Sequence, residues 1–196
     1  MLQHIRPAIV SIVLFTVLLG LAYPLAMTGI AGAAFPSQAG GSLIRDSSGQ
    51  VIGSSLIAQA FTRPAYLHPR PSAAGSGYDP MSSGGSNLGP MDKKLSDRIK
   101  GDAAPIAKAS PGAPIPADAV TTSASGLDPD VSPQNARLQA SRIGEARGAA
   151  TAEILAVIDD HTEGRLLGFI GQSRVNVLAV NRALDARFPM VQSRGR

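Results

Sequence analysis

The sequence predicts an α+β protein: one N-terminal transmembrane helix, then a single extracytoplasmic domain with a small sheet and three or four helices. An uncharged apolar stretch between Arg6 and Arg45 predicts the transmembrane helix. A hairpin pattern after it, and capped helical patterns in the C-terminal half, predict the mixed domain. We expect residues 1–7 to form a cytoplasmic tail, residues 8–34 the transmembrane helix, and residues 35–196 a periplasmic domain.

The apolar stretch is densest over Ala8–Ile30. About 20 residues of helix cross a bilayer core, so this stretch can span one. Pro24 should kink the helix, which membranes tolerate when neighbours satisfy the freed carbonyl. A cleaved signal peptide is the alternative, with Ala31-Gly32-Ala33 as a small-residue cleavage site. The apolar core of a signal peptide has only about 7–15 residues, which favours a retained anchor.

The charges around this stretch favour a cytoplasmic N-terminus. His4 and Arg6 precede the stretch, whereas Arg45 and Asp46, the first charges after it, cancel each other. The positive-inside rule therefore places the C-terminal domain outside the cytoplasm. A cleaved signal peptide would place it there too.

Short elements follow the anchor. Ser42–Ala58 reads as a hairpin, because two short apolar pieces flank turn residues that include Gly49. The spacing of apolar residues does not decide between helix and strand for Ser55–Phe61. Thr62–Pro90 should be irregular, and loops of this length are usually functional or bound to a partner. A short helix over Asp92–Lys100 and a second loop over Pro105–Asp130 complete this half.

The C-terminal half begins with a helix that runs from Ser132 to about Ala146. Ser is a good N-cap, Pro133 suits the first helical position, and Gly148 is a suitable stop. Further elements are expected after it: a helix over Ala149–Asp160, a buried strand over Leu166–Ile170 closed by Gly171, and a helix over Asn176–Arg187.

The composition excludes several classes of function. With no cysteine, the chain has no disulfide and no thiolate site. Its basic residues are scattered among acids, and aromatics are few, so we expect no nucleic-acid partner. The sequence also lacks the nucleophile-elbow, S-x-x-K, H-E-x-x-H and phosphate-loop patterns.

The polar clusters have structural interpretations that we prefer over chemical ones. His68 is expected to be a solvated or hydrogen-bonded loop residue. Asp128 or Asp130 is expected to accept backbone amides rather than bind calcium, which needs six to eight oxygens. The group Asp159, Asp160, His161 and Glu163 is expected to form a solvated helix-to-strand turn. We therefore predict no metal site and no catalytic residue.

One loop could hold an anion. Ser82–Asn87 is rich in glycine and serine, and its backbone amides could cradle a negative group. The alternative is a tight loop stabilised by its own Ser and Asn side chains.

Several sequence blocks, in order after one span, closely resemble the C subunit of the bacterial Kdp potassium-transporting ATPase. They run over nearly the whole chain: Gly53–Gln59, Phe61, Pro64, Tyr66, Arg70–Ala73, Tyr78, Ser83–Leu88, Thr121–Pro129, Gln139, Arg142, Ala146–Gly148 and Arg174–Leu178. The S-G-G-S-N-L and S-G-L-D-P blocks are the most specific. Ala58 departs from the family, which more often has glycine there.

The resemblance implies a non-catalytic accessory subunit of an ATP-driven potassium uptake complex in the bacterial inner membrane. Its partners would be a potassium-conducting channel-like subunit, a P-type ATPase subunit that carries the catalytic aspartate, and a small single-span subunit. The family is described as supporting assembly and as raising the affinity of the catalytic subunit for ATP. If this chain itself contacts ATP, the candidate residues are Ser83, Gly84, Gly85, Ser86, Asn87 and Gln139.

The predicted topology separates this domain from cytoplasmic ATP. We therefore expect ATP on the partner subunit, potassium to be handled by the complex, and any effect on ATP affinity to be allosteric. Our hypothesis places the domain on the outer face of the potassium-conducting subunit, near its entrance. The alternatives are a periplasmic binding protein released by cleavage near Ala33 and an enzyme with an unrecognised site.

Overall fold

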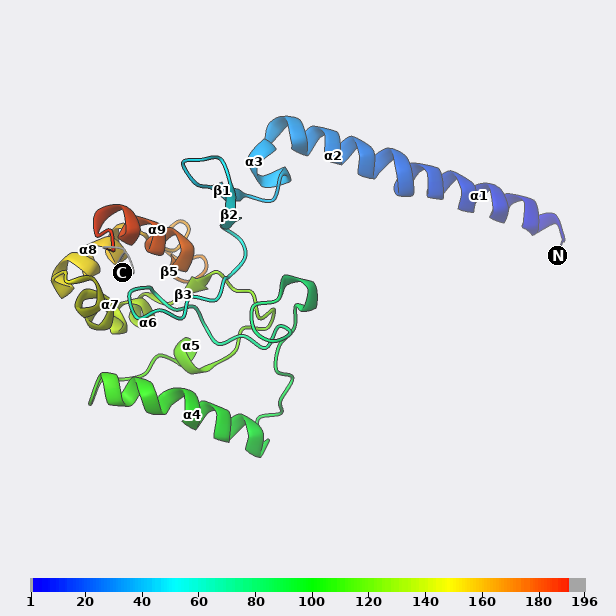
Figure 1. Ribbon diagram of the computed structural model, residues 1–196. Helices are drawn as coiled ribbons and strands as arrows, with labels where there is room; N and C mark the ends of the chain where they lie inside the picture. Colours follow the sequence, from blue (N-terminus) through cyan, green and yellow to red (C-terminus); the bar gives the residue numbers. More distant parts are fainter. Residues whose placement is uncertain (1, 191–196) are drawn as a thin grey trace, which may run out of the picture. The chain divides into compact units, whose positions relative to one another are not determined.

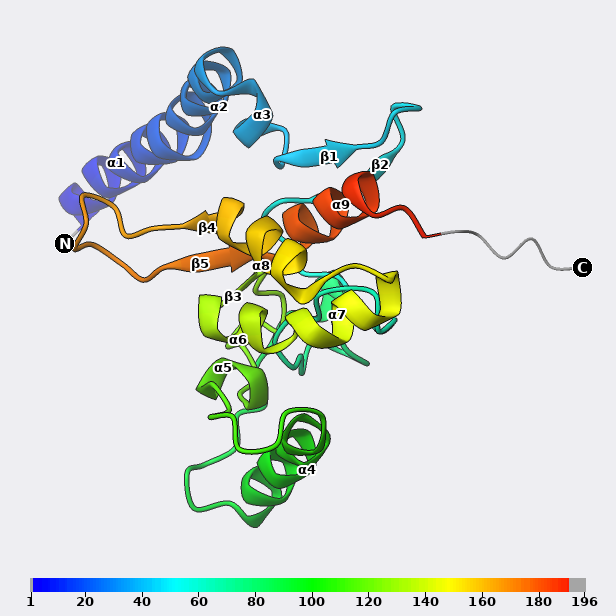
Figure 2. The ribbon, with the colours of Figure 1, turned by 90° about the vertical axis from the view of Figure 1, so that its left-hand side faces the viewer.

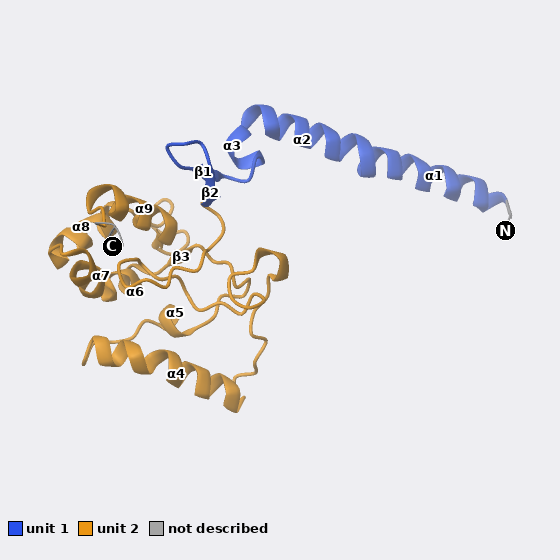
Figure 3. Cartoon of the chain, in the orientation of Figure 1, with its two compact units in different colours: residues 1–54 blue, residues 55–196 orange. Residues whose placement is uncertain are grey.

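The computed structural model describes residues 2–190 and shows two compact units, Met1–Ser54 and Ser55–Arg196 (Figure 3). The division falls after the hairpin, so the hairpin groups with the N-terminal helices and not with the rest of the predicted domain. The expected membrane boundaries at residues 7/8 and 34/35 stay predictions.

Unit 1 consists of a long apolar helix and the hairpin (Figure 1). The helix contains η1 (Leu2–His4), α1 (Ile5–Val17), the π-helical turn η2 (Leu18–Ala22) and α2 (Tyr23–Ala34). Its 30 residues from Ile5 to Ala34 are long and apolar enough to cross a membrane. Among the described residues, it is the one helix with this property.

The irregularity expected at Pro24 is a π-helical turn just before it. Proline lacks the N–H that an α-helix needs at that point. The N–H of Tyr23 bonds the carbonyl of Leu18, five residues earlier, which is the π pattern. Thr28 donates to the carbonyl of Pro24 at 2.8 Å, so a side chain satisfies one of the exposed carbonyls nearby.

The predicted hairpin is confirmed. After α3 (Pro36–Ala39), β1 (Leu43–Arg45) pairs antiparallel with β2 (Val51–Ser54). The Asp46 carboxylate accepts the amides at positions 48 and 50, which closes the turn. Gly49 has φ +84°, a conformation that favours glycine. Residues 55–61, left open between helix and strand, form a turn and extended coil instead.

Unit 2 combines helices with a three-stranded sheet (Figures 1 and 2). Its helices are η3 (Pro80–Ser82), α4 (Lys93–Ala109), α5 (Ala117–Val120), α6 (Pro133–Leu138), α7 (Ala140–Arg147), α8 (Thr151–Asp160) and α9 (Val177–Arg187). Strands β3 (Asp130–Val131), β5 (Arg174–Asn176) and β4 (Thr162–Glu163) lie in that order and pair antiparallel. The mixed helix-and-sheet class is therefore confirmed.

The core lies between α6, α7, α8, α9 and strands β3 and β5. Its buried members are Leu67, Val131, Ala136, Ala140, Ile143, Ile154, Val157, Ile158, Val175, Val177, Val180 and Leu184. Leu67 comes from the irregular segment between residues 62 and 90, so this segment is part of the core and not a surface appendage.

The capping predictions are confirmed. Ser132 accepts the amide of Asn135 at 3.1 Å, which is an N-cap bond at the start of α6. Asn176, expected only as the first residue of the last helix, caps α9 by accepting the amide of Ala179 at 3.0 Å. Gly148 ends α7 with φ +65°, the left-handed conformation of a C-terminal stop.

Two predicted helices differ in extent. The helix from Ser132 to about Ala146 is divided at Gln139, whose N–H bonds the carbonyl of Ala136, three residues earlier. The helix expected to end at Lys100 continues to Ala109. It passes through Pro105, so the predicted loop over Pro105–Asp130 is partly helical and also contains α5. No residue of α4 is buried, so Pro105 disturbs no core packing.

The buried strand predicted over Leu166–Ile170 is wrong. These residues form the exposed loop between β4 and β5, with one bridge between Leu166 and Ile170. A short apolar run has the sequence pattern of a buried strand whether or not other residues cover it. The positive φ of Gly171, +81°, fits the predicted end of the run, but as part of a loop.

Candidate functional site

The irregular segment 61–72 crosses the helices of unit 2 and is held by side chains instead of a neighbouring strand. The amide of Leu67 donates to Asn181 Oδ1 at 2.7 Å, and Asn181 Nδ2 donates to the Leu67 carbonyl at 2.9 Å. Asn181 is 2% exposed, so both bonds are shielded from water. A side-chain amide can imitate the donor and acceptor pair of a strand residue in this way.

Gln139 does the same for the next residue. It accepts from the amide of His68 at 2.9 Å and donates to the carbonyl of His68 at 3.2 Å. It also donates to Asn135 Oδ1 at 3.0 Å and accepts from Arg142 at 2.6 Å. These four bonds use both donors and both acceptor positions of the amide. The described contacts therefore make Gln139 a positioning residue of this segment, and its contact with a nucleotide stays a prediction.

Arginines hold the same segment from α7. Arg142 donates to the carbonyls of Pro64 and Tyr66. Arg147 donates to the carbonyl of Ala65 at 2.7 Å and lies 5.0 Å from the centre of the Tyr66 ring. Burial lowers the pKa of Arg142, yet an arginine stays charged in proteins.

His68 is a hydrogen-bonded loop residue, as predicted. Its Nε2 lies 3.0 Å from the Arg63 carbonyl and 3.4 Å from Arg142. Burial lowers the pKa of the imidazole, and the positive charge of Arg142 lowers it further. The folded chain therefore favours neutral His68.

This lowered pKa makes stability depend on pH. The unfolded chain binds more protons than the folded chain between the folded pKa of His68 and its ordinary value, 6.5. Stability is therefore expected to fall as the pH drops through this window, by at most about 1.4 kcal/mol per pH unit for this one group. Urea unfolding of the full chain and of a His68→Gln variant between about pH 7.5 and pH 5.5 measures it. An equal loss in both proteins would contradict this assignment.

The glycine- and serine-rich loop packs against a second loop, residues 123–127. The amide of Gly84 and the hydroxyl of Ser83 both donate to the Ser125 carbonyl, each at 2.9 Å. A Cβ on Gly85 would lie 3.0 Å from the Ala124 carbonyl oxygen, so the two backbones are close there. These contacts favour the tight-loop interpretation of Ser82–Asn87. Contact of Ser83, Gly84, Gly85, Ser86 or Asn87 with a nucleotide stays a prediction.

Gly126 lies where three loops meet, and it tests how tightly they pack. It has φ +68°, and an added Cβ would lie 2.6 Å from the Cβ of Ala74. Gly126→Ala is therefore expected to lower the free energy of unfolding by about 2 kcal/mol, through strain and overpacking together. Gly112→Ala is the matched control, because Gly112 has φ +76° and nothing within 4 Å. Strain alone should cost this control about 1 kcal/mol. Equal losses on urea unfolding would show that the loops have room to move.

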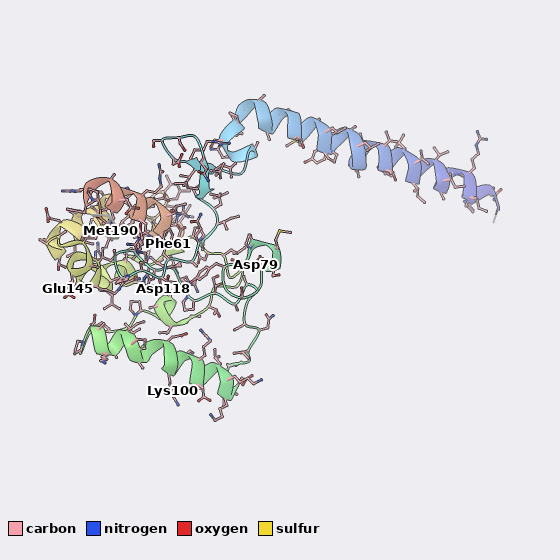
Figure 4. All side chains as sticks on the ribbon, viewed as in Figure 1. Phe61, Asp79, Lys100, Asp118, Glu145 and Met190 are labelled. Atoms are coloured by element: carbon pink, nitrogen blue, oxygen red, sulfur yellow. The ribbon has the colours of Figure 1, made fainter. Side chains whose placement is uncertain are left out.

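Unit 2 also contains a cleft of about 560 Å³ beside β3 and β5. Its lining residues are Arg70, Pro116, Ala117, Asp118, Asp128, Asp130, Val131, Ser132, Gln134, Gln172, Ser173 and Arg174. Asp118, labelled in Figure 4, lies on α5 and accepts the amide and hydroxyl of Ser132, each at 2.8 Å. The cleft thus brings together residues from four separate parts of the sequence.

The charged groups of this cleft are largely paired with one another. Arg70 contacts Asp128 at 2.8 Å, and Arg174 lies 3.4 Å from Asp130. Asp128 also accepts the amide of Asp130 at 3.0 Å, which confirms its predicted role as an acceptor in the loop. Burial raises the pKa of Asp130, against the lowering effects of an Asn176 hydrogen bond and of Arg174. In the described chain, no three His, Asp or Glu side chains gather as a group that could hold a metal ion.

The acidic cluster after α8 is not brought together as a site. Asp159 pairs with Arg137 at 2.7 Å, and Glu163 pairs with Arg174 at 2.7 Å. His161 ends α8, and its Nδ1 lies 2.8 Å from the Val157 carbonyl. The prediction of a helix-to-strand turn is confirmed.

Asn181 is a positioning residue that the sequence patterns above did not identify. The helical pattern of Val177, Val180 and Leu184 places position 181 on the buried face, where a polar residue needs a hydrogen-bonding partner. An asparagine among apolar positions was therefore the signal that could have identified it.

Comparisons with known proteins agree along the whole chain. Residues 5–186 match the family described as "KdpC: K+-transporting ATPase, c chain". A relative from Caulobacter sp. (strain K31) is 64% identical over 195 residues, which is 100% of both chains. A Caulobacter vibrioides relative is 63% identical over 98% of both chains. A Myxococcus xanthus relative is 52% identical over 92% of this chain and 87% of its own. Each of these relatives is named "Potassium-transporting ATPase KdpC subunit".

Proposed function

The chain belongs to the KdpC family of potassium-transporting ATPase subunits, and we propose that it is the non-catalytic accessory subunit that supports assembly of this complex. The observation that carries the proposal is the full-length match to relatives of this name, together with one apolar helix of 30 residues. The subunit is anchored in the bacterial inner membrane by this helix, and unit 2 lies on the periplasmic side.

The distribution of charge supports this orientation. Arg6 precedes the span, whereas the first charges after it, Arg45 and Asp46, cancel each other. The excess of positive charge near a span faces the cytoplasm. Unit 2 is then on the opposite side from ATP, so it raises the ATP affinity of the catalytic subunit through coupling between separate sites.

The contacts in the cleft support a structural role for its carboxylates. In the cleft, Asp118 is occupied by Ser132 and Asn135, and Asp128 is occupied by Arg70. These bonds fix the loops in place. We propose that unit 2 contacts the outer face of the potassium-conducting subunit, near its entrance, and that the cytoplasmic catalytic subunit and a small single-span subunit complete the complex.

Truncation at the boundary between the units tests the assembly role. A chain that ends at Ser54 keeps the span and hairpin and loses unit 2. We expect this variant to reach the membrane but to lose most co-purification with the catalytic subunit and most potassium uptake at low external potassium. Normal assembly and normal potassium affinity with the truncated chain would contradict the proposal.

The absence of cysteine makes the orientation easy to test. A membrane-impermeant maleimide should label Glu145→Cys in intact cells, and Gln3→Cys only after lysis. Both side chains are exposed. The reverse pattern would overturn the orientation. A mature chain without its first residues would instead support a cleaved signal peptide and a released binding protein.

A further inference from the structure

The loop between β4 and β5 exposes a concentrated group of large apolar side chains. Leu166 is 67% exposed, Leu167 76%, Phe169 72% and Ile170 47%. The loop projects beyond the helices α6 to α9 of the same unit (Figure 2). A soluble surface tolerates single exposed apolar residues, but a group of this kind indicates a contact surface.

The loop has a defined shape. Leu166 and Ile170 exchange two backbone hydrogen bonds, at 3.0 and 2.9 Å. The amide of Gly168 bonds the Arg165 carbonyl at 3.0 Å, and Leu167 has φ +54°. Leucine is strained in that conformation. Such strain persists only when surrounding structure imposes it, and it commonly marks functional segments.

The loop also carries charge of one sign only. Arg165 is the single charged residue from Gly164 to Ser173, and it is exposed. At the base of the loop, Glu163 is paired with Arg174 at 2.7 Å, so its charge is compensated. The loop therefore combines an apolar tip with one positive charge beside it. Such a combination suits the boundary of a membrane with anionic lipids, where the tip enters the acyl region and the cation stays among the phosphates.

We propose that residues 165–170 are a membrane foot, which inserts into the lipid leaflet that faces unit 2. The inference rests on the proposed membrane anchoring. Residues 35–54 join the span to unit 2 and would reach at most about 70 Å even if fully extended, so unit 2 stays near this bilayer. A narrow apolar tip fits a deformable lipid layer. A protein interface, in contrast, usually surrounds its apolar centre with a broad polar rim. The foot holds unit 2 at a fixed height above the membrane.

Fluorescence quenching on the full chain tests this proposal. Phe169→Cys is labelled with an environment-sensitive nitrobenzoxadiazole, and the chain is reconstituted in vesicles of phosphatidylethanolamine and phosphatidylglycerol. Glu145→Cys, exposed on α7 in the same unit, carries the same label as a control (Figure 4). We expect spin-labelled lipid to quench position 169 several-fold more than position 145, and aqueous iodide to do the opposite. Leu166→Cys gives a second, independent reading of the same loop.

The other outcomes overturn the proposal. Equal quenching of positions 169 and 145 by iodide would show that the loop stays in water. Protection of position 169 from both quenchers would assign it to a contact with a second copy of the chain. Co-purification of the unlabelled wild-type chain with the catalytic subunit is measured separately. A failure of the foot is therefore distinguishable from a failure of the proposed function.

Discussion

Replacing Arg147 with methionine is expected to lower the free energy of unfolding by about 4 kcal/mol, because two partly buried carbonyl groups lose their donor. The Arg147 side chain is 0% exposed. It donates to Ala65 at 2.7 Å, to Phe188 at 2.9 Å and to Asp185 at 2.9 Å. Methionine keeps most of the apolar stem, so the loss reports the hydrogen bonds and the cation–aromatic contact more than the packing.

Urea unfolding of the full chain in detergent micelles, followed by far-ultraviolet circular dichroism, measures this loss. Arg137→Met is the matched control, because Arg137 is 48% exposed and also pairs with an aspartate, Asp159. An exposed ion pair contributes about 0.5 kcal/mol, so the control should lose little. If the two variants lost similar free energy, Arg147 would not be a central support of the segment.

The functional consequence of Arg147→Met follows from the segments that the Arg147 side chain connects. It connects the irregular segment 61–72 to the ends of α7 and α9. Its loss should release this segment before the helices unfold, because the helices keep their own core contacts. Under the proposed function, this variant should weaken assembly of the complex at temperatures where the helical signal is still normal.

Local signals predicted the boundaries of several elements correctly. Ser132, Asn176 and Gly148 each act within one helical turn, and their chemistry is independent of the rest of the fold. Gly49 likewise acts inside its own turn. The sequence therefore predicted the start of α6, the end of α7 and the first hairpin, since a few neighbouring residues decide them.

Tertiary context decided the features that the sequence did not reveal. The run Leu166–Ile170 is apolar enough for a buried strand, yet nothing in the described chain covers it. Gln139 interrupts a predicted helix while its side chain binds the backbone of His68, 71 positions away in the sequence. The cleft joins Arg70 to Asp128, 58 positions apart. Periodicity and capping do not encode such distant pairs.

The candidate nucleotide residues also make contacts that the sequence did not reveal. Their selection came from a resemblance, and the structure shows what each does within the chain. Gly84 and Ser83 hold a neighbouring loop, and Gln139 holds a backbone segment. These contacts give the residues a structural role, and their contact with a nucleotide stays a prediction.

Asn181→Leu is expected to lower the free energy of unfolding by about 3 kcal/mol, the second-largest loss predicted here. Leucine has the same number and branching of side-chain heavy atoms as asparagine but neither donates nor accepts, so the amide and carbonyl of Leu67 would both be buried without a partner. The helix itself should tolerate the change, because leucine has a higher helix propensity than asparagine. Arg182→Leu, at the next and exposed position of α9, is the matched control, with an expected change within about 0.5 kcal/mol.

Asn181→Asp separates the two hydrogen bonds of this residue. An aspartate can still accept from the Leu67 amide, but it cannot donate to the Leu67 carbonyl, and its charge is buried at a position that is 2% exposed. This variant should therefore lose more stability as the pH rises from about 5 to 8, since burial favours the protonated acid, which can donate. The same loss at both pH values would show that water reaches the side chain at position 181. In that case the side-chain amides would not take the place of a neighbouring strand for the segment that carries Leu67 and His68.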